Sequence, residues 1–274
     1  MRSIPPDFDP QAVAAIDGRL EDIRRDQRVA TPHVIESGSR AWGFPSPDSD
    51  YDCRFLFVRR EDDYLSPWPR RDVIETPLTD DLDVNGWDLA KALKLMLKGN
   101  AVVIEWLMSP VAYGVATAFR DDLLALAQAQ VSAPRIARHY LHLGERQRRT
   151  YFGDGKHIQL KKIFYALRPA AALRWLRLHP GETIAPMHFP TLMEGSEPPA
   201  DVRDITADLI ARKAVTRELG SAQLPAPIET FIDGEFAIAR ESLPARSPHI
   251  AHEAKEAAEA LFRAWVRRLA SPRA

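Results

Sequence analysis

The stretch from Asp50 to Phe57 limits what this chain can fold into more than any other part of the sequence. Side chains of a strand point alternately to opposite faces, so a strand here places Asp50, Asp52 and Arg54 on one face. The opposite face holds only apolar or aromatic side chains: Tyr51, Cys53, Phe55 and Phe57. Such alternation is typical of a strand with one buried face. The stretch therefore predicts a core strand that presents two neighbouring carboxylates.

The two carboxylates indicate a particular chemistry. Adjacent like charges raise each other's pKa unless a cation neutralises them, and a divalent metal ion is the usual cation. Two metal ions held by such a pair clamp the attacking and leaving oxygens of a phosphoryl or nucleotidyl transfer. We therefore expect Asp50 and Asp52 to bind Mg²⁺ or Mn²⁺. The alternative is a polar turn that simply caps a strand.

Gly38-Ser39, upstream of the acids, suits the binding of the phosphates in such a reaction. A glycine lets backbone approach a phosphate closely, and a serine hydroxyl beside N–H groups at a helix N-terminus suits a polyphosphate. A plain tight turn is the alternative. Arg40 either steadies a phosphate or lies in solvent. Arg54 either neutralises the acids when no metal is bound or touches the nucleotide phosphates or the acceptor.

Gly38-Ser39, the interval from Arg40 to Ser49, and Asp50-Tyr51-Asp52 together resemble the signature of the DNA polymerase β nucleotidyltransferase superfamily. The fuller string, Gly-Ser-Arg-Ala-Trp-Gly ending in Ser-Asp-Tyr-Asp-Cys-Arg, is similar to the RlaP family, whose members are associated with RNA repair. The resemblance implies transfer of a nucleoside monophosphate from an NTP to an acceptor hydroxyl, for which an RNA end is one candidate.

The resemblance also implies a third carboxylate, which lies on a neighbouring strand between two apolar residues. Leu82-Asp83-Val84 has this pattern, so Asp83 takes the role of helping to hold the catalytic metal and activating the attacking hydroxyl.

Two alternatives to this function stay open. Relatives with the same fold modify a protein or a small-molecule hydroxyl, and a catalytically silent nucleotide- or RNA-binding module is a different class. Three clustered acids argue against silence.

A basic segment follows in the second half of the chain. Lys161, Tyr165 and Arg168 are spaced i, i+4 and i+7, which makes one stripe on a helix, and Lys162 lies beside it. A solvated face is the commonest explanation of such a stripe. The alternative is a surface that faces the catalytic cleft and grips the triphosphate or an RNA backbone. The segment resembles the RlaP family, so we assign all four residues to nucleotide binding.

Composition narrows the classes of protein. The chain has 274 residues, 45% of them hydrophobic and 27% charged, and a net charge of -1, which argues against a generally basic nucleic-acid coat. A single cysteine cannot form an internal disulfide. The first residues lack the apolar core of a signal peptide, and no later segment is apolar enough to span a membrane. We expect a cytoplasmic protein.

The pattern of periodicity predicts an α+β fold. Apolar spacing predicts helices at about 10–28, 89–98 and 102–108, and strands at 33–37, 52–59, 72–75 and 82–84. After Pro110 strand signals vanish, and helices are expected at about 119–130, 134–151, 159–179, 201–219, 228–242 and 249–269. We expect a polymerase-β-like core with a small mixed sheet in residues 1–112, followed by an all-helical domain in residues 113–274.

Overall fold

A computed structural model describes residues 1–79, 81–153, 158–217, 219–245 and 249–270. Its centre is a five-stranded mixed sheet with strand order β3-β4-β2-β1-β5. β2 and β4 run parallel, and the other neighbouring pairs are antiparallel. The strands are β1 (Ala30–Glu36), β2 (Tyr51–Val58), β3 (Val73–Glu75), β4 (Leu82–Asp88) and β5 (Ala112–Val115). The expected α+β class with a small mixed sheet is confirmed.

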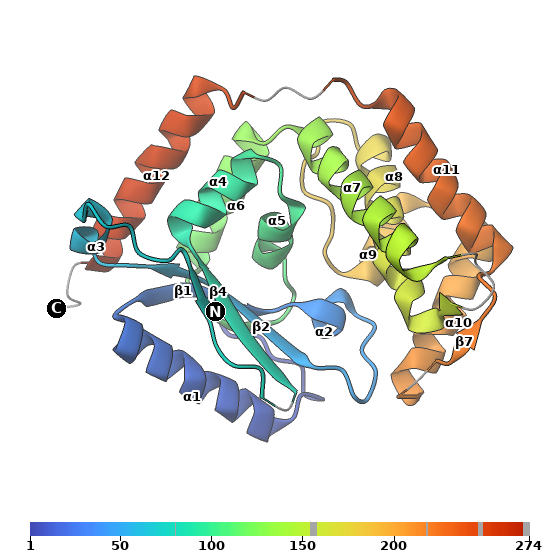
Figure 1. Ribbon diagram of the computed structural model, residues 1–274, viewed down its shortest axis with the longest axis horizontal. Helices are drawn as coiled ribbons and strands as arrows, with labels where there is room; N and C mark the ends of the chain where they lie inside the picture. Colours follow the sequence, from blue (N-terminus) through green and yellow to red (C-terminus); the bar gives the residue numbers. More distant parts are fainter. Residues whose placement is uncertain (80, 154–157, 218, 246–248, 271–274) are drawn as a thin grey trace.

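Helix α1 (Pro10–Gln27) covers one face of this sheet (Figure 1). It begins at Asp9, whose side chain accepts a hydrogen bond from the backbone N–H of Gln11, with a proline in the first turn. Its buried side chains meet the expected apolar face of β2 in one cluster, which includes Ile16, Leu20, Ile23, Tyr51, Cys53, Phe55 and Phe57. The prediction that Asp50 to Phe57 supplies a core face is thereby confirmed, and Cys53 is buried there.

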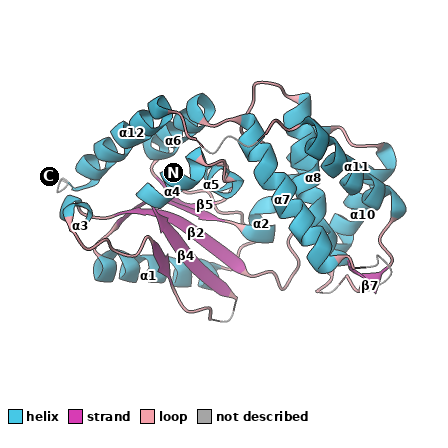
Figure 2. Cartoon of the chain, turned by 45° about the horizontal axis from the view of Figure 1, so that its top comes forward, coloured by secondary structure: helices cyan, strands magenta, loops and turns pink. Residues whose placement is uncertain are grey.

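The other face of the sheet carries a larger core. Leu56 and Val58 of β2 belong to it, together with side chains from the helices that follow. Figures 1 and 2 show these helices above the sheet, on the side opposite α1. They are α4 (Leu89–Leu97), which Asp88 caps, α5 (Ala101–Leu107) and α6 (Thr117–Gln130).

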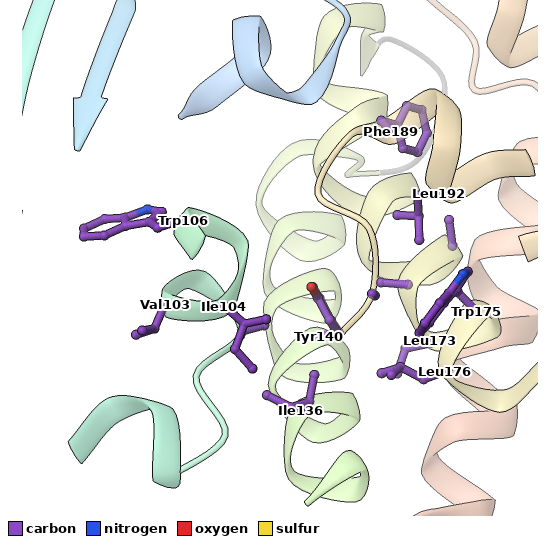
Figure 3. Packing of buried hydrophobic residues seen from close by; sticks show 14 of the residues in the cluster. Val103, Ile104, Trp106, Ile136, Tyr140, Leu173, Trp175, Leu176, Phe189 and Leu192 are labelled. Carbon is purple, nitrogen blue, oxygen red and sulfur yellow. The ribbon is translucent and has the colours of Figure 1, made fainter. Parts of the chain in front are cut away.

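The second half of the chain is mostly helical and lies beside the sheet (Figure 2). Figure 3 shows Ile104 of α5 and Ile136 of α7 facing each other, where the first helices meet the second half. One hydrophobic cluster runs through both halves. The elements are α7 (Ala133–Tyr151), β6 (Ile158–Gln159), a 3₁₀ turn η1 (Leu160–Lys162), α8 (Ile163–Leu178), α9 (Phe189–Ser196), α10 (Ala200–Val215), β7 (Ser221–Ala222) and α11 (Ala226–Ser242).

Two features depart from the expectation drawn at Pro110. β5 pairs with β1, so the expectation that strands end at Pro110 was wrong. The last helix, α12 (His252–Ala270), returns to the first half and packs on α3 (Glu61–Leu65), α4 and α6. The division at residues 112 and 113 stays a prediction, and the sheet and its helical cover take residues from both sides of it. Within the described residues, no helix combines the length and apolar character needed to cross a membrane.

Candidate active site

Asp52 and Asp83 occupy paired positions on the parallel strands β2 and β4. Neighbouring strands lie about 4.8 Å apart, so side chains at paired positions are adjacent. Arg54 lies against both acids: its Nη2 is 3.0 Å from Asp52 Oδ1 and 2.6 Å from Asp83 Oδ2. The strand pairing thus brings together two acids that are 31 residues apart in the sequence numbering, with one guanidinium as their shared counter-ion.

Gly38 lies directly against the carboxylate of Asp52. A Cβ atom at this position would stand 1.9 Å from Asp52 Oδ2, and the backbone φ of Gly38 is 60°, a left-handed value that favours glycine. Gly38 opens the short helix α2 (Gly38–Trp42). The Gly-Ser half of the motif and the acid half therefore meet in space, as the sequence predicts.

Asp50 lies outside the strand pairing that joins Asp52 and Asp83. It precedes β2 and is exposed, and its pKa is raised by partial burial and by the charges of Asp81, Asp83 and Asp48. The pKa of Asp52 is raised as well, chiefly by burial, although Arg54 opposes the shift. Within the described residues, no three His, Cys, Asp or Glu side chains come close enough together to hold a metal ion.

The donor set nevertheless fits a divalent cation at two of the three expected acids. Carboxylate oxygens are the ligands that Mg²⁺ and Mn²⁺ prefer, and Asp52 and Asp83 already share one positive charge. Arg54 occupies the position between them. A metal ion held by both acids would therefore compete with this guanidinium.

This competition can be measured without nucleotide. Arg54→Gln is expected to bind Mn²⁺ about tenfold or more tightly than the wild type, because attraction between partly buried opposite charges exceeds about 1.4 kcal/mol, which is a factor of ten. Electron paramagnetic resonance of free Mn²⁺ during a titration gives the affinity, with Arg60→Gln, an exposed arginine beyond β2, as the matched control. Equal affinities in the wild type and both variants would mean that Arg54 and the cation do not compete.

Glu36, which the sequence reasoning missed, supports Asp52 from behind. Its side chain has no exposed surface. One carboxyl oxygen accepts a 2.7 Å hydrogen bond from the backbone N–H of Asp52, and the other accepts one from the hydroxyl of Tyr113. Burial raises the pKa of Glu36 to about 8, although both hydrogen bonds oppose the shift. The signal in the sequence was that Glu36 lies near the end of an expected strand, two residues before Gly38.

Ser39 and Arg40 close the loop that joins the two halves of the motif. Ser39 Oγ donates to Ser49 Oγ at 2.9 Å, and Arg40 Nη2 donates to the carbonyl of Ser49 at 2.6 Å. The guanidinium of Arg40 also lies 3.9 Å from the ring centroid of Tyr51. These contacts give Arg40 a role in holding the loop, and its role with a phosphate stays a prediction.

Part of the basic segment lies near the acids. Tyr165 is half-buried, and its pKa is raised first by burial and then by the neighbouring charges of Tyr151 and Asp52. Lys162 lies between two rings, 4.7 Å from the centroid of Tyr151 and 4.8 Å from that of Tyr165. Lys161 acts on the same phenol, since its charge opposes the rise in the pKa of Tyr165. Lys161 and Lys162, in the turn η1 before α8, therefore lie close to Tyr165, whose phenol interacts with the charge of Asp52.

Arg168 does not share that face. It is 6% exposed, and its guanidinium binds both carboxylate oxygens of Glu105, at 3.0 and 3.1 Å. It also lies 4.1 Å from the ring centroid of Trp42. The expectation of one accessible stripe from Lys161 to Arg168 was therefore wrong, because α8 is packed on several sides. We leave Arg168 out of the nucleotide-binding set.

Comparison with known proteins gives two matches. The family model described as "RlaP: RNA repair pathway DNA polymerase beta family" matches residues 13–264. A protein of Bacillus subtilis (strain 168) described as "Uncharacterized protein YcgL" is 37% identical over 217 residues, which cover 79% of this chain and 82% of that protein. No solved structure matches.

Proposed function

The chain belongs to the RNA repair pathway DNA polymerase beta family, and on that premise we propose that it transfers a nucleoside monophosphate from an NTP to an acceptor hydroxyl. The observation that carries the proposal is the placement of Asp52 and Asp83 at paired positions, with Gly38 against Asp52. A glycine at this place lets the carboxylate of Asp52 lie against the backbone that opens α2. That juxtaposition suits phosphate chemistry better than a merely structural turn.

Each acid of the candidate site, and Arg54, has a separate role in this proposal. A divalent cation, when bound by Asp52 and Asp83, supplies positive charge to the phosphates of the nucleotide. Arg54, which such a cation would displace from the acids, would neutralise a phosphate oxygen instead. Asp50 adds negative charge beside these acids, where its carboxylate would help to hold a cation bound to the nucleotide.

Basic side chains from the second half complete the nucleotide site in this proposal. Lys161 and Lys162, with Tyr165, bind the triphosphate tail, because both lysines act on Tyr165, whose phenol interacts with the charge of Asp52. Asp83 accepts the proton of the attacking hydroxyl, which then attacks the α-phosphorus and releases pyrophosphate. An RNA end is the acceptor that the family's description favours.

The test is a labelling experiment with four NTPs that carry ³²P at the α-phosphate. The protein is incubated with each NTP and Mg²⁺, with and without RNA that ends in a 3′-hydroxyl. We expect label to appear on the RNA with one or more NTPs and to disappear when EDTA removes the cation.

Other outcomes separate the alternatives. Label on the protein itself, or on a small molecule, would keep the transferase reaction and replace the acceptor. Tight NTP binding without any labelled product would indicate a binding module. If no NTP binds and no label appears, the proposed function is wrong.

A further inference from the structure

Helix α10 carries a buried lysine that is distant in sequence from the predicted motifs. Lys213 is 7% exposed, and its Nζ donates a 2.7 Å hydrogen bond to the backbone carbonyl of Phe44. No ion pair of Lys213 occurs among the residues that the structure describes. Burial lowers the pKa of Lys213 to about 8. Removing an ammonium from water is costly unless it is paired, so the position of Lys213 calls for an explanation.

Phe44, its acceptor, is the anchor of the loop between the two halves of the motif. The N–H of Phe44 donates to the carbonyl of Ser39 at 3.1 Å, directly after α2. Its ring stacks on Phe164 with centroids 4.5 Å apart and meets Phe189 edge-on at 5.5 Å. Lys213 Nζ lies 5.3 Å from the same ring centroid. Phe44 is thus fixed on its side chain by α8 and α9 and on its carbonyl by α10.

The loop that starts at Phe44 returns to the acids through a chain of hydrogen bonds. The N–H of Ser46 donates to Ser49 Oγ at 2.8 Å, and the N–H of Ser49 donates to the carbonyl of Ser46 at 3.0 Å. Ser49 in turn accepts from Ser39 and Arg40. Movement at Phe44 therefore changes both Gly38-Ser39 and the residues that lead into Asp50.

The charges near Lys213 belong to the same site. Asp48 raises the pKa of the lysine, whereas Lys161 and Arg40 lower it. These groups come from the motif loop, from α2 and from the turn before α8. The ammonium thus lies within electrostatic range of two side chains that the sequence analysis assigned to nucleotide binding.

We propose that Lys213 is a positioning residue of the nucleotide site: its ammonium holds the carbonyl of Phe44 and thereby fixes the loop between Gly38-Ser39 and Asp50. The inference rests on the proposed function for its catalytic consequence. This proposal assigns a function to α10, for which the sequence alone indicated none. Lys213 acts through Phe44 and does not touch the reacting atoms.

The first measurement is local and needs no activity. Residues 45 and 47 are prolines, so the informative amides of the loop are those of Phe44, Ser46 and Ser49, which are all hydrogen-bonded. In Lys213→Met, which keeps most of the side-chain volume, these amides are expected to exchange with deuterium about tenfold faster. A charged hydrogen bond is worth roughly that factor or more. Amides of β2 should keep their rates and so report that the fold is intact.

The second measurement concerns nucleotide. Lys213→Met should raise the KM for the NTP about tenfold while kcat changes less, and Lys213→Arg, which restores a cationic donor, should recover most of the loss. Lys91→Met is the matched control, because Lys91 binds Asp72 at 3.1 Å and has no contact with the loop.

Different results would overturn the role of Lys213 and the proposed nucleotidyl transfer. Equal exchange rates at Phe44, Ser46 and Ser49 in the wild type and Lys213→Met would overturn the role of Lys213, whatever the activity. That role would also be overturned if Lys213→Arg behaved like Lys213→Met in both measurements. Faster loop exchange in a protein whose wild type binds no NTP would instead leave the hold on Phe44 standing and remove the proposed function.

Discussion

Asp52→Asn is expected to lower the kcat of nucleotidyl transfer by about a thousandfold or more, which is the order of effect for a group that stabilises charge at a reacting phosphate. Asparagine keeps the size of aspartate but lacks the negative charge that holds a cation. The carboxylate of Asp52 lies against Gly38 and shares Arg54 with Asp83, so its charge acts at the centre of the candidate site.

The same substitution is expected to leave the fold intact. The pKa of Asp52 is raised in the folded protein, mainly because burial disfavours its charge. A raised carboxyl pKa means that the charged form costs stability above the pKa of the unfolded chain, so neutral asparagine should unfold at an equal or slightly higher temperature. Asp62→Asn, an exposed acid of α3, is the control for both assays. Transfer at the wild-type rate in Asp52→Asn would remove this residue from the mechanism.

Arg168→Met is expected to lower the free energy of unfolding by about 3–5 kcal/mol, because it leaves the buried carboxylate of Glu105 without its partner. Glu105 is 5% exposed and receives two hydrogen bonds from Arg168 and one, at 3.0 Å, from the hydroxyl of Tyr140. The guanidinium also lies over Trp42, which adds a cation–π contact. This network joins α5, α7 and α8 to the helix that carries Gly38.

A double-mutant cycle separates the pair from its surroundings. Arg168→Met with Glu105→Leu should lose much less stability than the sum of the two single changes, because no unpaired charge then remains. Urea unfolding monitored by circular dichroism gives the free energies. The control is Arg263→Met, whose exposed pair with Glu259 on α12 should be worth less than about 1 kcal/mol. If the buried and the exposed pair cost the same, Arg168 does not organise the core.

Local signals in the sequence were enough for most elements of the fold. Asp9 and Asp88 cap the helices expected at about 10–28 and 89–98, and a short polar side chain before an apolar period is a local signal. The strand 112–115 was missed because its four residues, Ala-Tyr-Gly-Val, carry little pattern and form a strand only by pairing with β1. α8 starts later than expected, at Ile163, because Ile158–Gln159 pairs with β7 and a 3₁₀ turn follows.

The candidate site was predictable only where its residues are close in sequence. Gly38 and Asp52 belong to one motif, and a family resemblance supplied Asp83. The helical spacing of Lys161 and Arg168 predicted a shared face, but spacing carries no information on which face a neighbouring helix covers. Lys213 was out of reach, because its partner Phe44 lies 169 residues away and no local pattern marks such a contact.

The return of α12 to the first half has a consequence for the order in which the chain folds. Trp265 and Phe262, near the end of the sequence, pack on Phe119 and Tyr64, and Trp265 also donates a hydrogen bond to Asp122. The apolar surfaces of α4 and α6 therefore stay uncovered during folding until α12, which is distant in sequence, has packed on them. A nascent or truncated chain that ends after α11 presents those surfaces to other chains.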